Sequence, residues 1–443
     1  MASQDIPREK AVEILRAVDA GSFADPLLAA ARQHLAPRDS AFLLELVYGV
    51  LRQRAHLDWI LETFSAQPLS RTDPATRNIL RLGAYQMLFL DKVPVSAAVN
   101  TSTEMAKKQG RKSGYVNGLL RNLDRGRNRI AGPPAEDPAR RLAILYSHPL
   151  WLVRRWIKRF GPERTEDILR DNNRPSALGL RANLLKTSRD ALKQALESEG
   201  ADLRETGYSP AGLELLSSPG IQRLSSYQAG LFMIQDEAAQ LVSLMLAPRP
   251  GEAVLDACAA PGGKATHLAE LMSNTGRLVA LENDPARIER IRENSDRLGL
   301  SIIEPLRADA SSWGGGSFDK ILIDAPCSGL GVLRRHPDGR WNKRESTIRE
   351  RAVLQQAILQ NCSRLVRPGG ALVYSTCTTE PEENEDVIAA FLERSGSLFA
   401  LDDPRPFLPR SAHSFVDEAM FFRTFPNDPA MDGFFGARIR RNA

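Results

Sequence analysis

The segment ILIDAPCSGLG, residues 321–331, indicates the fold of the C-terminal half of the chain. It begins as an apolar strand, and at its end Asp324, Pro326 and Cys327 lead into the turn-forming run Ser328–Gly331. In α/β folds, ligands bind in the crevice outside the carboxyl ends of the strands. A strand that stops at a carboxylate and a thiol therefore predicts reactive side chains at one edge of a sheet.

The residues around this segment alternate between strand and helix patterns, in the order typical of a doubly wound sheet. Right-handed crossovers place the loops that follow all of these strands at the same edge. The strands are expected in AVLDACA (253–259), RLVALEN (277–283), IIEPLRADA (302–310), FDKILIDAP (318–326) and GGALVYSTC (369–377), and the helices in ATHLAELM (265–272), PARIERIRENSDRLG (285–299) and about 345–365.

Length and composition limit the class of protein. A chain of 443 residues with 42% hydrophobic and 26% charged residues is typical of a globular protein with two or three domains. No apolar run reaches the ~18 residues of a membrane span, and the start MASQDIPREKAVEIL has no apolar signal core. We therefore expect a cytoplasmic protein without a membrane partner.

The cysteines have neither the spacing of a metal site nor that of a disulfide framework. They stand at positions 258, 327, 362 and 377, with no C-x-x-C pair and no nearby histidines. We expect reduced thiols with individual roles and no bound metal. Cys362 follows the pattern of a small buried hydrophobe in a helix, and Cys258 is expected to line a loop mainly through its backbone.

The first third of the chain is expected to be helical. Ala11, Ile14, Leu15 and Val18 repeat at helical spacing, and Asp73 with the following proline is typical of a helix start. The segment RGRNRIAGPPAEDP (125–138) has the glycine, proline and arginine content of a linker. We expect an all-α domain over 1–138, a small α+β domain over 139–240 that positions the substrate, and an α/β domain with a Rossmann-like sheet over 241–443.

Basic residues gather in three clusters. Such clusters suit a polyanion whose phosphates release counterions on binding, although a solvated helix face remains the alternative for each cluster. Three clusters close together in the sequence favour nucleic acid as the partner. They comprise Lys107, Lys108, Arg111 and Lys112; Arg121, Arg125, Arg127 and Arg129; and Arg154, Arg155, Lys158 and Arg159.

The expected sheet edge carries the residue types of a nucleoside site. Gly262 and Gly263 in CAAPGGK let a ligand approach the backbone closely, but the loop lacks the G-x-G-x-x-G spacing that holds a pyrophosphate. Glu282 ends the second strand, where an acid typically accepts hydrogen bonds from a ribose diol, and Asp309 ends the third. Together they predict an adenosine without phosphates.

Several of these motifs together resemble the RNA cytosine-C5 methyltransferases of the RsmB/NOP family. The resemblance rests on DACAAPGGKATHLAE (256–270), Glu282, Asp309, DAPCSG (324–329) followed by RRHPDGRW (334–341), and YSTCTTEPEEN (374–384). The N-terminal segment, with GYVNGLLRNL (114–123), looks like a NusB-type RNA-binding domain, and FRTFPNDPAMDGFFGARI (422–439) is similar to the last strands of the family. Over the whole chain, the order of motifs is similar to that of the bacterial 16S ribosomal RNA enzymes.

The resemblance implies a class I methyltransferase domain, S-adenosylmethionine as cofactor, 16S ribosomal RNA as partner and a monomeric enzyme. It implies that Cys377 is the nucleophile, that Cys327 assists release of the adduct, and that Asp324 and Lys264 are catalytic. By this resemblance Asp324 contacts the target base; the alternative is an acid of the cofactor site, and both roles can hold together. The implied cofactor-binding residues are Cys258, Ala259, Ala260, Pro261, Gly262, Gly263, Lys264, Glu282, Asp309 and Asp324, and the expected RNA contacts are Arg334, Arg335, His336 and Arg340.

Two alternatives remain open from the sequence. The chain could methylate transfer RNA or another ribosomal site, against which the NusB-like segment argues. It could instead be a non-catalytic RNA-binding scaffold, against which the intact Cys377, Cys327, Asp324 and Lys264 argue.

Overall fold

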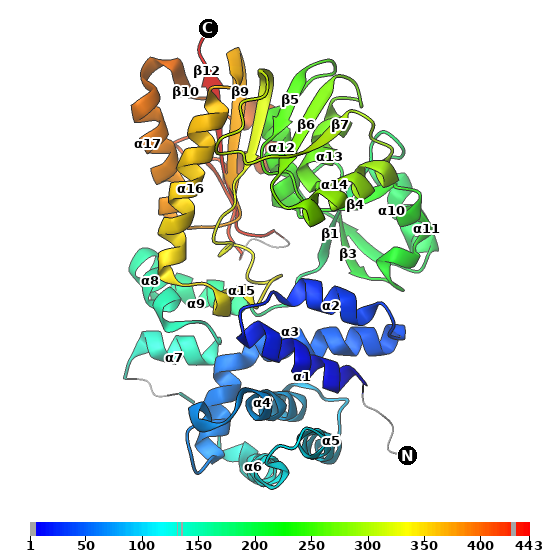
Figure 1. Cartoon of the computed structure of the whole chain (residues 1–443), viewed down its shortest axis with the longest axis vertical. Helices are drawn as coiled ribbons and strands as arrows, with labels where there is room; N and C mark the ends of the chain where they lie inside the picture. Colours follow the sequence, from blue (N-terminus) through cyan, green and yellow to red (C-terminus); the bar gives the residue numbers. More distant parts are fainter. Residues whose placement is uncertain (1–5, 131, 134–135, 427–430) are drawn as a thin grey trace. The chain divides into compact units, whose positions relative to one another are not determined.

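The computed structural model describes residues 6–130, 132–133, 136–426 and 431–443 and divides into two compact units (Figure 1). The first unit is Met1–Arg174 with Leu333–Lys343, and the second is Pro175–Val332 with Arg344–Ala443. The predicted linker over 125–138 and the terminal motif over 422–439 lie partly outside the described residues.

The first unit is helical, as its apolar periodicity predicts. Asp73 begins α4 by accepting a hydrogen bond from the Thr76 backbone N–H at 3.1 Å, with Pro74 in the first turn. Buried leucine, isoleucine and valine side chains of α1, α3, α4 and α6 form its core. The helices are α1 (Ile6–Asp19), α2 (Ala24–Arg32), α3 (Pro37–Phe64), α4 (Pro74–Phe89), α5 (Val95–Lys108), α6 (Ser113–Gly126), α7 (Pro138–Leu145), α8 (Leu150–Phe160), α9 (Pro162–Asp171) and the short α15 (Gly339–Asn342).

The segment Leu333–Lys343 belongs to the helical unit although it follows the DAPCSG strand in sequence. The Trp341 indole N–H donates to the Leu51 carbonyl at 2.9 Å, and an Asp338 carboxylate oxygen accepts from the Ala24 backbone N–H at 3.0 Å. The two partners of each contact are about 300 residues apart in the sequence, so periodicity does not reveal these contacts. The helices α7 to α9 also belong to this unit, so the two compact units divide at residue 174, inside the range expected for the small α+β domain.

The second unit begins with a small antiparallel sheet in the order β2-β3-β1-β4. Ser188 begins its helix α10 by accepting from the Ala191 backbone N–H at 3.1 Å. One face of the sheet packs on α10 through buried leucines. The elements are β1 (Leu178–Ala182), α10 (Arg189–Ser198), β2 (Asp202–Glu205), β3 (Gly212–Ser217), α11 (Ser225–Gln228) and β4 (Phe232–Ile234).

The rest of the second unit is one mixed sheet in the order β10-β12-β9-β8-β5-β6-β7, with β11 paired to β12. Strands β5 to β9 are parallel, whereas β12 runs antiparallel to β9. The elements are α12 (Glu237–Leu246), β5 (Ala253–Asp256), α13 (Gly263–Leu271), β6 (Arg277–Glu282), α14 (Pro285–Leu298), β7 (Ile303–Arg307), β8 (Phe318–Asp324), α16 (Glu345–Ser363), β9 (Val366–Thr376), α17 (Glu385–Ser395), β10 (Phe399–Leu401), β11 (Phe422–Arg423) and β12 (Phe435–Arg441).

Helices cover both faces of this sheet because successive residues of its strands point to opposite sides. In β5, Val254 packs in the cluster that contains α12, α13 and α14, whereas Leu255 packs in the cluster that contains α16 and α17. Figure 1 shows α16 and α17 together on one side of the strands. The architecture agrees with the expected classes: a helical part, a small α+β part and a Rossmann-like α/β part.

Candidate active site

The carboxyl ends of the parallel strands lie at one edge of the sheet. Strand order reverses between β5 and β8, since β5 is followed by β6 on one side and β8 by β9 on the other. This is the topological switch point at which open α/β sheets bind ligands. The loops after β5 and β8 carry CAAPGGK and APCSGLG, and Cys377 directly follows β9.

The loop after β5 is held by backbone contacts. Ala259 donates its N–H to the Leu281 carbonyl at 2.9 Å, and Gly262 donates to the Ala259 carbonyl at 2.7 Å. Gly262 has φ 101°, and a Cβ there would lie 3.3 Å from the Ile291 Cα on α14. The left-handed backbone and this close helix packing both require glycine. At Gly263, an added Cβ would meet nothing nearer than 3.9 Å, so its surroundings are open.

The two predicted acids of the nucleoside site differ in burial. Glu282 is only 7% exposed, and one of its oxygens accepts from the backbone N–H groups of Asn283 and Asp284 at 2.9 and 3.1 Å. Asp309 is exposed and closes a turn by accepting from the Ser311 N–H at 2.8 Å. Both follow adjacent parallel strands, as predicted.

Lys264 and Asp324 form an ion pair with 2.7 Å between Nζ and Oδ2, and Ser375 donates to the other oxygen of Asp324 at 2.9 Å. Burial alone would lower the pKa of Lys264, but the Asp324 carboxylate outweighs it and the pKa is raised. Burial and the nearby Asp324 raise the pKa of Asp256, at the end of β5, to about 7. Lys264 also lies 5.1 Å from the centre of the Phe434 ring. The lysine therefore stays cationic among carboxylates.

Cys327 and Cys377 are in contact, with 3.2 Å between their Sγ atoms, although 50 residues separate them in sequence. The hydrogen bond with Cys327, followed by burial, raises the pKa of the Cys377 thiol well above its usual value. Lys264 acts in the opposite direction and lowers it, but is outweighed. The structure thus brings together the two cysteines that the sequence singles out, within electrostatic reach of the Lys264–Asp324 pair.

The other two cysteines take no part in this contact. Burial raises the pKa of the Cys362 thiol to about 12, and its sulfur faces the Ala310 carbonyl in the core below α16. Burial also raises the pKa of Cys258 well above its usual value. All four cysteines are free thiols.

The segments after β8 and β9, which carry Cys327 and Cys377, are joined by hydrogen bonds of residues to which the sequence analysis gave no role. Gly331 donates its N–H to the Cys377 carbonyl at 3.0 Å, and its own carbonyl accepts from the Gly433 N–H at 2.9 Å. The Ser328 N–H donates to the buried Glu383 carboxylate at 2.8 Å. Glu383 lies in TTEPEEN, directly after YSTC, and this adjacency is the only sequence signal for it.

The four predicted RNA contacts lie in the helical unit. The expectation for Arg340 does not fit the structure, because its side chain is fully buried and both terminal nitrogens donate to protein oxygens, including the Ser147 carbonyl at 3.0 Å. Arg334 is also buried, at 8% exposure. Arg335 is partly exposed, and His336 is exposed and paired with Asp25 at 2.7 Å.

The polar groups at this edge of the sheet fit the expected adenosine-bearing cofactor. Glu282 and Asp309 supply acceptors for hydroxyl or amino groups, and the open space at Gly263 admits a ligand next to the backbone. The amide Nε2 of Gln235 is buried beside this loop and has no hydrogen-bond partner within residues 6–130, 132–133, 136–426 and 431–443. Among the described residues, no cluster of histidine, cysteine or acidic side chains could hold a metal ion, and no helix is long and apolar enough to cross a membrane.

Three family models match successive parts of the chain. Residues 5–125 match the NusB family, residues 148–222 match the ferredoxin-like domain of RsmF/B-like methyltransferases, and residues 243–440 match the 16S rRNA methyltransferase RsmB/F family. The matched ranges follow the helical part, the small sheet and the large sheet in order.

Similar proteins extend over most of the chain. It is 38% identical to "Probable ribosomal RNA small subunit methyltransferase B" of Bacillus subtilis over 92% of each chain. It is 35% identical to "Ribosomal RNA small subunit methyltransferase B" of Vibrio cholerae over 97% of this chain and 95% of that protein. A solved methyltransferase homologue from Pyrococcus horikoshii is 30% identical, with a TM-score of 0.59, over 70% of this chain and all of its own.

Proposed function

Because the chain belongs to the ribosomal RNA small subunit methyltransferase B family, we propose that it methylates C5 of a specific cytosine in 16S ribosomal RNA through a covalent intermediate on Cys377. The observation that carries the proposal is the contact between the Cys327 and Cys377 sulfurs at the carboxyl edge of the sheet. One of two thiols in contact can add to a pyrimidine ring while the other assists its release.

S-adenosylmethionine, the cofactor of this family, supplies an electrophilic sulfonium methyl when it is bound. Glu282 would hold its ribose hydroxyls, and Asp309 its adenine or amino group. The loop Cys258–Lys264 would cover it through main-chain contacts, with Ala259, Ala260 and Pro261 between Cys258 and the two glycines. Asp324 would lie at the boundary between cofactor and target base.

Cys377 makes the attack because C5 of cytosine is by itself a poor nucleophile. The thiolate sulfur forms a bond to C6, the C5–C6 double bond opens, and C5 becomes an enamine-like carbon that can accept the methyl group. The Asp324 carboxylate would accept hydrogen bonds from the exocyclic amine and from N3 once that atom is protonated, and it would so stabilise the charge that moves into the ring. Lys264 fixes the direction of Asp324 through their 2.7 Å ion pair and lowers the pKa of Cys377.

Cys327 assists the release of the methylated RNA from Cys377. After transfer, C5 carries a proton and the methyl group. The Cys327 thiolate, as the proposed base, takes this proton, the electron pair of the C5–H bond re-forms the C5–C6 double bond, and the C6–sulfur bond breaks to return the Cys377 thiolate. The hydrogen bond between the two sulfurs places Cys327 where it can exchange a proton with Cys377 as the latter leaves. A single thiol would lack this partner and release the RNA more slowly.

The helical unit supports a large anionic substrate. Eight basic residues of α5, α6, the turn between these helices and the turn after α6 are exposed, which suits phosphate contacts. The target cytosine has to be unstacked, which costs least in a loop or single strand. Arg335 and His336 stay in the proposed RNA-contacting set, whereas the buried Arg334 and Arg340 are better suited to holding their own segment in place.

The same proposal has the enzyme act as a monomer in the cytoplasm. Four free thiols, two of which have to be reduced for the chemistry, suit a reducing compartment.

Methyl transfer to purified RNA tests the proposal. The protein is incubated with S-adenosylmethionine that carries a labelled methyl group and with protein-free 16S RNA, 23S RNA or transfer RNA, and the products are digested to nucleosides. We expect label in 5-methylcytidine from 16S RNA alone. Label in another nucleoside, or in another RNA in preference to 16S RNA, would contradict the proposal.

A further inference from the structure

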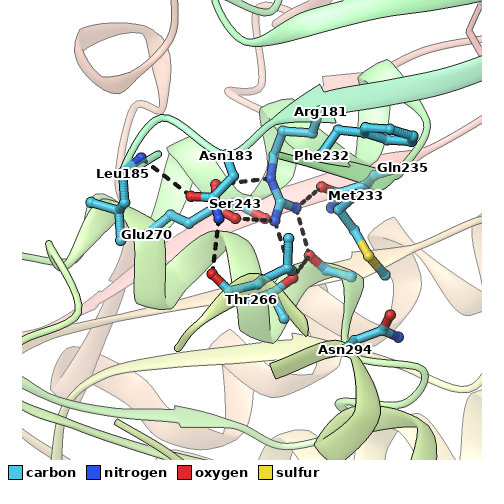
Figure 2. A network of polar contacts seen from close by, with 12 residues as sticks. Arg181, Asn183, Leu185, Phe232, Met233, Gln235, Ser243, Thr266, Glu270 and Asn294 are labelled. Atoms are coloured by element: carbon cyan, nitrogen blue, oxygen red, sulfur yellow. Dashed lines mark hydrogen bonds and ion pairs between the residues drawn. The ribbon is translucent and has the colours of Figure 1, made fainter. Parts of the chain in front are cut away.

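Arg181 of the small antiparallel sheet reaches the helix that follows the proposed cofactor loop. It lies on β1, is fully buried, and directs its guanidinium at α13 (Figure 2). There it donates to both carboxylate oxygens of Glu270, at 3.3 and 2.8 Å, and to the Thr266 hydroxyl at 3.1 Å. One side chain of the ferredoxin-like domain thus holds the first two turns of α13.

Arg181 also contacts the proposed cofactor loop itself. Its Nη1 donates to the Gly263 carbonyl at 2.8 Å, and Thr266 donates to the Gly262 carbonyl at 2.8 Å. Gly262 and Gly263 are the glycines of CAAPGGK. The guanidinium therefore fixes the main chain at the point where the loop becomes a helix.

The same guanidinium sets the orientation of Gln235. Arginine is only a donor, so the atom of Gln235 that faces it has to be the oxygen Oε1, and the two are hydrogen-bonded. The amide Nε2 then faces away from Arg181. It is buried with no hydrogen-bond partner in the part of the chain that the structure describes, and it lies 3.9 Å from the position that a Cβ on Gly263 would take. A buried donor without an acceptor is costly, and such a group in a native protein calls for an explanation.

We propose that Gln235 binds S-adenosylmethionine through its Nε2 donor, and that Arg181 is the positioning residue that aims this donor and holds the loop. The small antiparallel sheet, with Arg181 on β1 and Gln235 directly after β4, would then supply part of the cofactor site in addition to any contact with RNA. The inference rests on the proposed placement of the cofactor on the Cys258–Lys264 loop. The proposal gives a role to the fully buried Arg181, which extends from β1 to α13 and forms an ion pair there with the buried Glu270.

Gln235→Glu is the sharpest variant, because it retains an oxygen for Arg181 and replaces the amide donor by a second, negatively charged carboxylate oxygen that can only accept. We expect the dissociation constant for S-adenosylmethionine, measured by calorimetry without RNA, to rise roughly 10-fold or more. The KM for the cofactor should rise in parallel while kcat at saturation and the thermal midpoint change little. A folded Gln235→Glu variant that binds the cofactor with unchanged affinity would overturn the assignment of Gln235.

The positioning role of Arg181 is tested by the double variant Arg181→Met/Glu270→Met, since removal of Arg181 alone would leave a buried carboxylate without its partner. The matched control is Arg204→Met/Glu214→Met, an ion pair between β2 and β3 of the same sheet that does not contact α13. We expect weaker cofactor binding in the first double variant and normal binding in the second. Equal, unchanged affinities in both folded variants would refute the positioning role.

These results can be separated from the fate of the proposed function. If the wild-type protein binds the cofactor but methylates no RNA, the proposed function has failed, whereas the calorimetry still decides this inference. If the wild-type protein methylates 16S RNA while Gln235→Glu and the Arg181 double variant bind the cofactor normally, only this inference has failed.

Discussion

A thiol that attacks carbon has to be ionised, yet in this chain the pKa of Cys377 is raised, first by its hydrogen bond with Cys327 and then by burial. Only the thiolate reacts, so alkylation of Cys377 should be slow at neutral pH and should speed up as the pH rises towards its pKa. Cys327→Ala removes the largest cause of the shift and should make Cys377 react faster at pH 7.5. Lys264→Met removes the cation that lowers the pKa and should make it slower.

The measurement is the rate of iodoacetamide labelling of Cys377 between pH 6 and 10, followed by peptide mass spectrometry. Cys362 is the internal control, because burial holds its pKa at about 12 in every variant. Identical pH profiles for Cys377 in the wild type and in Cys327→Ala would show that the sulfur contact does not control its ionisation.

Glu282 tests the placement of the cofactor. We expect Glu282→Ala to weaken S-adenosylmethionine binding by roughly 1 to 3 kcal/mol, because bound hydroxyl groups would lose their acceptor. Glu304→Ala is the matched control, since Glu304 lies on the neighbouring strand β7, is about half exposed and pairs with Arg277. If calorimetry gives the wild-type affinity for Glu282→Ala, the ribose has been placed at the wrong strand end.

The residues that the sequence predicted at this scale share one property. Glu282, Asp324 and Cys377 each stand at or just after the end of a parallel strand, and Lys264 begins the helix that follows the loop after β5. Strand periodicity and crossover rules therefore suffice to gather them. Glu383 and Gln235 act through contacts with residues 55 and 54 positions away, respectively. No local pattern encodes such contacts.

At the scale of elements, the loops after β8 and β9 have to approach each other closely for the two sulfurs to meet. Gly331 makes this possible, because a Cβ there would lie 2.1 Å from the Gly433 carbonyl oxygen and 2.9 Å from that of Cys377. Gly331→Ala should push these segments apart, lower the free energy of unfolding by about 1–3 kcal/mol and reduce kcat at least 10-fold.

Thermal unfolding and single-turnover methylation measure the two effects. Gly314→Ala is the control, because a Cβ at Gly314 meets no atom within 4 Å. Were Gly331→Ala as stable and as active as Gly314→Ala, the close contact between the loops would not matter for catalysis.

The helices and parallel strands of the large sheet were predictable from periodicity and caps, but two features at this scale were not. Strand β12 joins the sheet antiparallel to β9 after a long intervening segment, and strand pairing at that distance has no local signature. The segment Leu333–Lys343 reads as part of the α/β domain by position, yet its Trp341 and Asp338 contacts place it in the helical unit.

At the scale of the whole molecule, the exposed bases of the helical unit should dominate RNA affinity. Each phosphate contact contributes a slope of ~0.7 to the dependence of log K on log salt for single-stranded RNA, so Arg121→Gln/Arg125→Gln/Arg127→Gln should reduce the slope by roughly 2. The control is Arg277→Gln/Arg290→Gln/Arg292→Gln, which removes the same charge from exposed sites in the second unit. Equal slopes for the two triple variants would favour the solvated-face interpretation.

The central claim concerns the complex of enzyme and RNA, and trapping it tests the claim most directly. The wild type, Cys327→Ala, Cys377→Ala and the double variant are each incubated with S-adenosylmethionine and 16S RNA, then separated by denaturing electrophoresis. Cys327→Ala retains the attacking thiol but impairs release, so it alone should accumulate a methylated RNA adduct, attached at Cys377. An adduct that accumulates with Cys377→Ala and vanishes with Cys327→Ala would reverse the two roles, and no adduct in any variant would contradict covalent catalysis by this pair.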